Sequence, residues 1–166
     1  RPRTVPNEEG ELITPSAVFF DRQSPIVGRE ALRAAELEPE RLARFAKRDV
    51  GQRQFGKSIC GCAFPPEVIE SLVLGKLKHD AGLKLGQFSK AVVTVPAYFN
   101  EPRRKATQDA GRLAGLEVID IINEPTAAAI AYGLERGFVS ADGARGDRER
   151  VLVYDLGGGT FDLTLM

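Results

Sequence analysis

The fold is decided by Val151-Leu-Val-Tyr-Asp-Leu-Gly-Gly-Gly-Thr-Phe-Asp-Leu-Thr-Leu-Met166, the last sixteen residues of the chain. Its first part, Val151–Leu156, is an almost wholly apolar run of strand length. Its last part, Phe161–Leu165, alternates apolar and polar side chains, as a half-buried strand does. Three consecutive glycines form a tight turn between the two runs. The stretch therefore predicts a strand, a phosphate loop and a second strand.

The three glycines and the two flanking acids indicate an anion site with a cation beside it. Residues without a Cβ reach positive φ and let successive backbone N–H groups approach an anion. Asp155 and Asp162 are placed to hold a cation next to that anion. An ordinary glycine hairpin with flanking acids remains the alternative, because such hairpins are common.

Composition places the chain among ordinary globular proteins of one domain. Its 166 residues are 43% hydrophobic and 28% charged. Lys+Arg and Asp+Glu are equal at 23 each, so there is no basic field for nucleic acid or anionic lipid. The longest apolar runs fall far short of the ~20 residues that span a bilayer. We expect neither a nucleic-acid partner nor a membrane span.

The cysteines and the single histidine do not predict a metal site. Cys60, Cys62 and His79 are too few ligands, at too short a spacing, for structural zinc. We expect two reduced thiols, a solvated helix position for His79, and a reducing compartment such as the cytoplasm. The chain begins at Arg1 and stops at Met166 inside an expected strand. Both ends look cut, so the lack of a signal peptide proves little.

The N-terminal half is expected to alternate short extended and helical segments. Turns at residues 7–10 and 24–25 flank a strand over Ser16–Phe20. Residues 29–36 and 38–48 are rich in Ala, Leu, Arg and Glu, and predict two short helices. Gly51–Phe64 is expected to be irregular.

The C-terminal half is expected to alternate helices with strands that are buried on both faces. Apolar spacing and cap residues predict helices over residues 65–82, 100–114 and 125–133, and strands over residues 91–95 and 118–122. Residues 136–150 carry three glycines and no periodicity, and we expect the loop between two domains there. The order predicts an α/β fold, with helices packed on the faces of a sheet.

A second phosphate motif competes with the glycine hairpin. Gly51-Gln-Arg-Gln-Phe-Gly-Lys-Ser58 satisfies the P-loop pattern G-x-x-x-x-G-K-[ST]. A P-loop must follow a buried strand and open a helix whose N-terminal amides face the phosphate. The preceding Arg44–Asp49 is too charged for a central strand, and Pro65 follows soon after. A P-loop NTPase therefore remains a less favoured alternative.

Three separated stretches resemble the ATPase domain of one family, the DnaK-type seventy-kilodalton heat-shock chaperones. They are Ala91–Asn100 (AVVTVPAYFN), Ile122–Leu134 (INEPTAAAIAYGL) and Asp155–Asp162 (DLGGGTFD). A weaker likeness at Thr14–Ser16 and Phe45–Arg48 extends the resemblance over nearly the whole chain. It implies an actin-like fold of two lobes, each built on a ribonuclease-H-like sheet, with ATP or ADP between them. Residues 1–135 would be most of the first lobe, 136–150 the inter-lobe loop, and 151–166 the opening hairpin of the second lobe.

The resemblance also assigns roles to individual residues. Gly157, Gly158, Gly159 and Thr160 match the loop that holds the β- and γ-phosphates. Asp155 and Asp162 match acids that serve the Mg²⁺ and K⁺ shells. Glu124 matches the catalytic glutamate that orients the attacking water, and Lys47 matches the lysine that contacts the transferred phosphoryl group. Pro96 and Arg104 match a proline switch and a relay arginine. Without the resemblance, Glu124 would be a helix-start carboxylate, Pro96 a strand stop and Arg104 a residue on a solvated helix face.

The family implies a chaperone that hydrolyses ATP while it binds unfolded peptides through a domain missing here, with a J-domain co-chaperone and a nucleotide exchange factor as partners. The stretch from Arg48 to Phe64 is much shorter than the family's usual insertion. The first phosphate loop, the adenosine pocket and the peptide-binding domain are also missing. We therefore expect the isolated segment to be inactive. A non-hydrolysing actin-like scaffold stays open as an alternative, and a sugar kinase is a more distant one.

Overall fold

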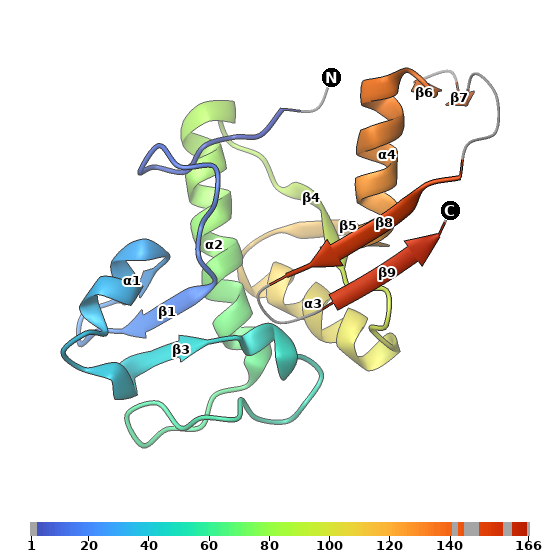
Figure 1. The fold of residues 1–166 in the computed structure, drawn as a ribbon. Helices are drawn as coiled ribbons and strands as arrows, with labels where there is room; N and C mark the ends of the chain where they lie inside the picture. The colour runs from blue at the N-terminus through green and yellow to red at the C-terminus, as the bar shows by residue number, and fades with distance from the viewer. Residues whose placement is uncertain (1–2, 141–142, 145–149, 158–160, 166) are drawn as a thin grey trace.

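The computed structural model describes residues 3–140, 143–144, 150–157 and 161–165 of the chain. Within these ranges, helices and strands alternate along the chain (Figure 1). The described strands form one three-stranded sheet and three separate two-stranded pairs. The predicted α/β class is confirmed at this level, although the described strands do not join into a single sheet.

The N-terminal sheet is antiparallel and has the strand order β2-β1-β3. Its strands are β1 (Ala17–Phe20), β2 (Pro25–Val27) and β3 (Leu42–Arg44). Helix α1 (Arg29–Ala34) follows β2, and helix α2 (Pro66–Leu85) begins near β3 and runs past the sheet to the N-terminal segment (Figure 1). The predicted strand over Ser16–Phe20 and the predicted helix from Arg29 are confirmed.

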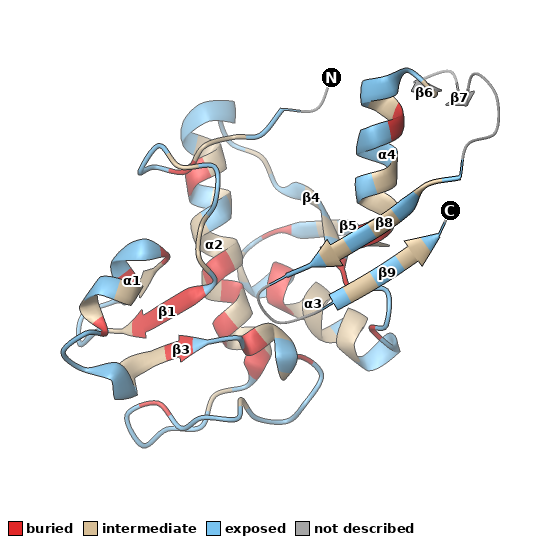
Figure 2. Cartoon of the chain, in the orientation of Figure 1, coloured by how far each residue is buried: buried red, intermediate tan, exposed pale blue. Residues whose placement is uncertain are grey.

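The two faces of β1 are both buried, each by a different helix. Ala17 and Phe19 pack with Ala31 and Ala35, in and just after α1. Val18, on the opposite face, belongs to the cluster that contains Ile69 of α2. Successive side chains of a strand point to opposite faces, so one short apolar strand serves two clusters. This part of the molecule is the most deeply buried one (Figure 2).

The predicted helix over residues 38–48 is wrong. The structure has a 3₁₀ turn η1 (Pro39–Arg41), then β3, then a second 3₁₀ turn η2 (Ala46–Arg48). Ala43 pairs with Val18 in the ladder and is fully buried, so tertiary packing outweighs the helix propensity of this segment. Phe45 adopts φ of 63°, which interrupts any right-handed helix.

Helix α2 is longer than predicted. It continues through Gly82 to Leu85, and its cap Gly86 has φ of 78° with its N–H bonded to Gly82 O at 3.0 Å. A glycine inside a helix costs only about 1 kcal/mol, which packing along the rest of the helix offsets. The helix therefore ends at Gly86, the glycine with positive φ, and not at Gly82.

The central unit is a parallel pair of strands joined by a helix. Strand β4 (Lys90–Val95) pairs with β5 (Glu117–Asn123), and α3 (Glu101–Leu113) makes the crossover between them. The Asn100 side chain caps α3 by accepting a hydrogen bond from Arg103 N at 3.3 Å, as predicted. Helix α4 (Glu124–Arg136) begins directly after β5. These elements match the predicted order.

The central strands are less covered than the sequence predicts. Val92 of β4 and Ile119 of β5 are both exposed, and exposed and partly buried positions alternate along β4. A strand that is apolar on both faces requires a cover on both. Among the described residues, packing covers the two strands only in part, so the expectation of strands buried on both faces is not met.

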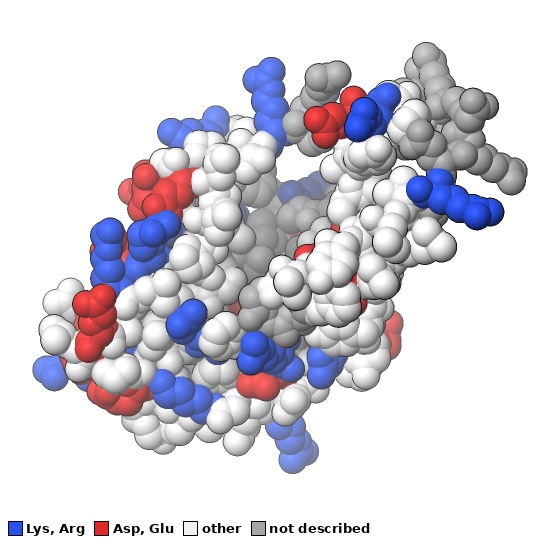
Figure 3. All heavy atoms as spheres, in the orientation of Figure 1, with Lys and Arg blue, Asp and Glu red and all other residues white. Residues whose placement is uncertain are grey.

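The C-terminal part consists of two small hairpins. Residues 136–150, expected to be a loop, include the end of α4 and the short pair β6 (Val139–Ser140) and β7 (Gly143–Ala144). Strands β8 (Leu152–Leu156) and β9 (Phe161–Leu165) pair antiparallel, which confirms the two predicted strands, while the predicted turn at residues 158–160 lies outside the described residues. Within the described ranges no helix is both long enough and apolar enough to cross a membrane. Acidic and basic side chains are interspersed over the face seen in Figure 3.

Candidate functional site

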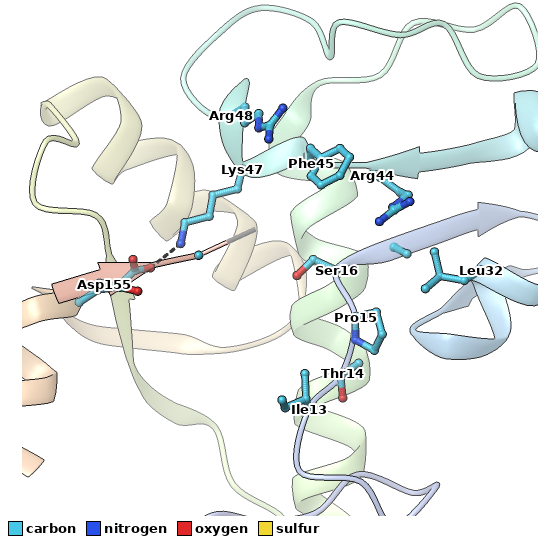
Figure 4. A pocket seen from close by; sticks show the side chains of 13 residues that line it. Ile13, Thr14, Pro15, Ser16, Leu32, Arg44, Phe45, Lys47, Arg48 and Asp155 are labelled. Atoms are coloured by element: carbon cyan, nitrogen blue, oxygen red, sulfur yellow. Dashed lines mark hydrogen bonds and ion pairs between the residues drawn. The ribbon is translucent and has the colours of Figure 1, made fainter. Parts of the chain in front are cut away.

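A cavity of about 510 Å³ lies where the β1–β3 region, the start of α4 and the β8–β9 hairpin meet (Figure 4). Lys47, Glu124, Asp155 and Gly157, all predicted site residues, line it. The other lining residues are Ile13, Thr14, Pro15, Ser16, Ala17, Leu32, Arg44, Phe45 and Arg48. The fold thus brings together residues that are far apart in the sequence.

Lys47 reaches the cavity from the 3₁₀ turn η2, which follows a left-handed residue. The φ of 63° at Phe45 lies in a region that bulky residues rarely adopt. Its ring is flanked by the guanidinium groups of Arg44 and Arg48, at 4.8 and 4.6 Å from the ring centroid. Ala46 anchors the turn in the buried cluster. These contacts fix the backbone from which Lys47 projects.

Glu124 lies at the junction of β5 and α4, opposite Lys47. It is the first residue of α4, where the helix dipole favours a carboxylate. Its Oε1 accepts a hydrogen bond from Lys47 Nζ, and the two side chains form an ion pair. The Glu124 side chain is 18% exposed and that of Lys47 is 41% exposed, so the pair sits at the wall of an open cavity.

Pro96 and Arg104 support the edge of the sheet at which Glu124 lies. Parallel pairing places the ends of β4 and β5 together, with Val95 opposite Asn123, and Pro96 follows β4 as a fully buried residue. Arg104 donates to Phe99 O at 3.1 Å and to Asn123 Oδ1. Its guanidinium is therefore not on a solvated face but ties α3 to the residue before Glu124.

The β8–β9 hairpin places two carboxylates directly opposite each other. Asp155 and Asp162 are register partners. Like charges at directly opposite positions of an antiparallel pair destabilise it. Asp162 Oδ2 is also buried, and no described residue donates a hydrogen bond to it. A cation bound between these acids would relieve both costs, so this donor set fits the predicted metal site. The predicted loop residues Gly158, Gly159 and Thr160 lie outside the described residues.

Glu70 was missed by the sequence analysis. This carboxyl of α2 is partly buried, and burial raises its pKa, while the nearby Lys47 ammonium offsets part of that rise. Phe45 and Asn123 were also not predicted as supports of the site. No sequence pattern shows a left-handed φ at a phenylalanine.

The P-loop interpretation of Gly51–Ser58 is wrong. Residues 49–58 form turns and bends, β3 ends several residues earlier at Arg44, and the next helix is α2. Lys57 Nζ donates to Pro39 O at 2.8 Å and to Leu42 O at 2.9 Å. Lys57, the residue that would bind phosphate in a P-loop, therefore links this loop to η1 and to the start of β3.

The cysteines and the histidine are placed as predicted. Cys60 and Cys62 are free and exposed, on either side of Gly61 in a tight turn. His79 is exposed on α2.

The fold brings Lys47, Glu124 and Asp155 to one cavity of an α/β protein, and comparisons with known proteins show its family. The family described as Hsp70 protein matches residues 54–166. The proteins named chaperone protein DnaK from Thermotoga petrophila, Thermotoga maritima and Thermotoga neapolitana are each 48% identical to this chain over 164 residues. Each alignment covers 98% of this chain and 26% of the relative. The chain therefore belongs to the Hsp70 family and spans 26% of the length of these relatives.

Proposed function

We propose that this chain is an ATP-binding and ATP-hydrolysing segment of a molecular chaperone. The observation that carries the proposal is the convergence of Lys47, Glu124 and Asp155 on one cavity. Family membership supports it, because 48% identity to proteins named chaperone protein DnaK extends over nearly the whole chain. The fold proposed for the parent domain is actin-like, with residues 1–135 in the first lobe, 136–150 between the lobes and 151–166 in the second.

The residues around the cavity suggest a division of labour. Lys47 would exchange its contact with Glu124 for a phosphate oxygen and stabilise the negative charge that develops during transfer. Glu124, released from the lysine, would accept a hydrogen bond from the attacking water and orient it. The loop from Gly157 to Thr160 would hold the β- and γ-phosphates through its backbone N–H groups.

Asp155 and Asp162 would hold the metal side of the site. A bound Mg²⁺ would supply charge neutralisation at the phosphates, and we place K⁺ as a second ion beside it. The buried, unpartnered oxygen of Asp162 supports this assignment. Pro96 and Arg104 would relay the nucleotide state, because Arg104 already links α3 to the residue before Glu124.

The remaining proposals concern the whole protein. Unfolded peptides would bind to a domain outside these residues, and a J-domain co-chaperone and a nucleotide exchange factor would act on the ATPase domain. We place the protein in the cytoplasm. These assignments rest on family membership, since this chain corresponds to 26% of its relatives.

Steady-state ATP hydrolysis by the full-length protein tests the assigned roles. Lys47→Ala and Glu124→Gln should each lower turnover by ~100-fold or more, the scale of lost acid–base or electrostatic catalysis. Lys57→Ala is the matched control and should leave turnover unchanged. Unchanged hydrolysis in Lys47→Ala would remove the catalytic role of Lys47 and favour the scaffold alternative.

A second measurement concerns the 166-residue segment alone. We expect no ATP turnover, because the family resemblance assigns none of these residues to the adenosine pocket. Hydrolysis that disappears in Glu124→Gln would show that the segment is a complete enzyme.

A further inference from the structure

A second cluster of charged side chains lies away from the cavity, where the N-terminal turn meets α2. Asn7 holds this turn, because its Oδ1 accepts from Glu11 N at 2.6 Å and its Nδ2 donates to Thr14 at 3.3 Å. The turn carries Glu8 and Glu9 toward the second half of α2, beside which the N-terminal segment runs in Figure 1. The cluster has no part in the proposed ATP site.

One ammonium serves three carboxylates in this cluster. Lys76 Nζ lies 3.0 Å from Glu9 Oε1, 3.0 Å from Asp80 Oδ1 and 3.8 Å from Glu8 Oε2. Three carboxylates around one ammonium leave a local excess of negative charge.

Asp80 is the least compensated member of the cluster. Its side chain is only 4% exposed, and its Oδ2 is buried without a hydrogen-bond partner among the described residues. A buried carboxylate oxygen that lacks a donor costs free energy, because the water it lost has not been replaced. The site therefore offers a fixed anionic oxygen that a cation would satisfy.

His79 adds a nitrogen ligand near the Asp80 carboxylate. Ligand atoms of Glu8, His79 and Asp80 all lie within 4.8 Å of one another. Imidazole and carboxylate are the donors of many zinc sites that keep one position open for water. We propose that Glu8, His79 and Asp80 form a binding site for a divalent transition-metal ion, with Zn²⁺ as the best fit.

The distances require only a small adjustment of exposed side chains. Ligands about 2.1 Å from zinc in a tetrahedral array lie about 3.4 Å apart, so atoms within 4.8 Å of each other must move by roughly 1 Å. The Glu8 side chain is 60% exposed and His79 is exposed, so both are free to change rotamer. Asp80 supplies the fixed point.

The metal would connect two segments that are held together mainly by charge. Glu8 comes from the N-terminal turn, while His79 and Asp80 come from α2. Binding to the folded state alone stabilises it by mass action, so added Zn²⁺ should raise the unfolding midpoint of the whole chain. Nucleotide binding is not required for this effect, and the site stands or falls separately from the proposed ATPase function.

The test is a Zn²⁺ titration of the chain with Cys60→Ser and Cys62→Ser, because the exposed thiols would otherwise compete for the metal. Isothermal calorimetry measures affinity. The imidazole NMR signal reports the ligand directly, since His79 is the single histidine. We expect one Zn²⁺ per chain and a shift of the His79 signal on binding.

Variants then separate this site from adventitious binding. His79→Ala and Glu8→Gln change exposed side chains and should each weaken Zn²⁺ binding by about ten-fold or more, equivalent to ~1.4 kcal/mol. Glu117→Gln, which removes an exposed acid elsewhere, should have no effect. An unshifted His79 signal, or equal affinity in His79→Ala, would overturn the proposal.

Discussion

The β1–β3 sheet and the β8–β9 hairpin both contain apolar strands, but these strands have opposite surroundings. Val18 of β1 is fully buried, and helices cover both faces of its strand. In the hairpin, Leu152, Leu163 and Leu165 are all more than half exposed. Apolar strand residues therefore form a core in one region and an exposed apolar face in the other. A strand pattern predicts local conformation, while burial depends on which elements pack against it.

This contrast also separates the halves of the candidate site. Lys47 stands on a turn anchored in a buried cluster, whereas Asp155 stands on the hairpin, whose outward face lacks a cover among the described residues. Packing therefore holds the backbone at Lys47 more firmly than the backbone at Asp155. Stability measurements on the two regions can test this difference.

The largest expected effect comes from comparing two truncations: a buried side chain that packs in the same cluster as Val18 of the β1–β3 sheet, and an exposed side chain of the β8–β9 hairpin. Ile69→Ala removes a side chain that is 2% exposed and should lower the free energy of unfolding by about 3 kcal/mol. Leu163→Ala in the hairpin should change it by less than about 0.5 kcal/mol. Urea denaturation of the isolated chain measures both. Equal losses would contradict the contrast between the regions.

Gly→Ala substitutions at two helical glycines should have smaller effects on stability, and the effects should be of opposite sign. A Cβ at Gly111 of α3 would lie 2.3 Å from Val118 Cγ2, so Gly111→Ala should destabilise the chain by about 1–3 kcal/mol through overpacking. A Cβ at Gly82 of α2 meets nothing within 4 Å. Gly82→Ala should therefore stabilise by up to ~1 kcal/mol. Thermal unfolding of both variants checks the opposite signs.

The hairpin's paired acids give a smaller effect in the opposite direction. Without a metal, Asp162→Asn should stabilise the chain by about 0.5 kcal/mol, since it removes the repulsion across the ladder. Asp155→Asn should act similarly, and the double variant should add little to either single change. Full additivity in the double variant would show that the two carboxylates do not interact.

The smallest effect concerns pH and Glu70. Burial raises the pKa of this carboxyl above its ordinary 4.5, with Lys47 opposing the rise, so the folded state holds the proton more tightly than the unfolded state. The stabilisation that protonated Glu70 gives the folded state is fully present below the ordinary pKa. It is lost as pH rises through the raised pKa of the folded state.

We therefore expect Glu70→Gln to gain stability relative to the parent chain as pH rises above 4.5. Urea denaturation at a series of pH values measures this, with Glu117→Gln as the exposed control. A constant difference across the series would exclude the shifted titration of Glu70.

Much of the local structure could be predicted because its signals are local. Asn100 caps α3, Gly115 with φ of 74° follows that helix, and β8 pairs with β9. The error over residues 38–48 has a different origin. Helix propensity there is outweighed by the pairing of Ala43 with Val18, a contact between distant residues that composition does not reveal.

The site shows the same division. The cavity brings together Lys47, Glu124 and Asp155, which were predicted from sequence resemblance. The partners that hold them were not predicted, because they depend on tertiary geometry. Examples are the left-handed Phe45 and the contact of Arg104 with Asn123. The P-loop spelling of Gly51–Ser58 failed for the converse reason, since the motif lacks its strand and helix.

The Lys47–Glu124 pair has a consequence for folding kinetics. Its partners are 77 residues apart in sequence, so their contact closes a long loop. Lys47 depends on the packing of β1–β3 with α2, and Glu124 depends on the pairing of β4 with β5. When a contact joins residues that are far apart in sequence, the chain loses conformational entropy on closing the loop before the contact contributes any stability. Such contacts therefore form slowly. The two charges should therefore meet late, and an intermediate with both sheets formed would still lack the pair.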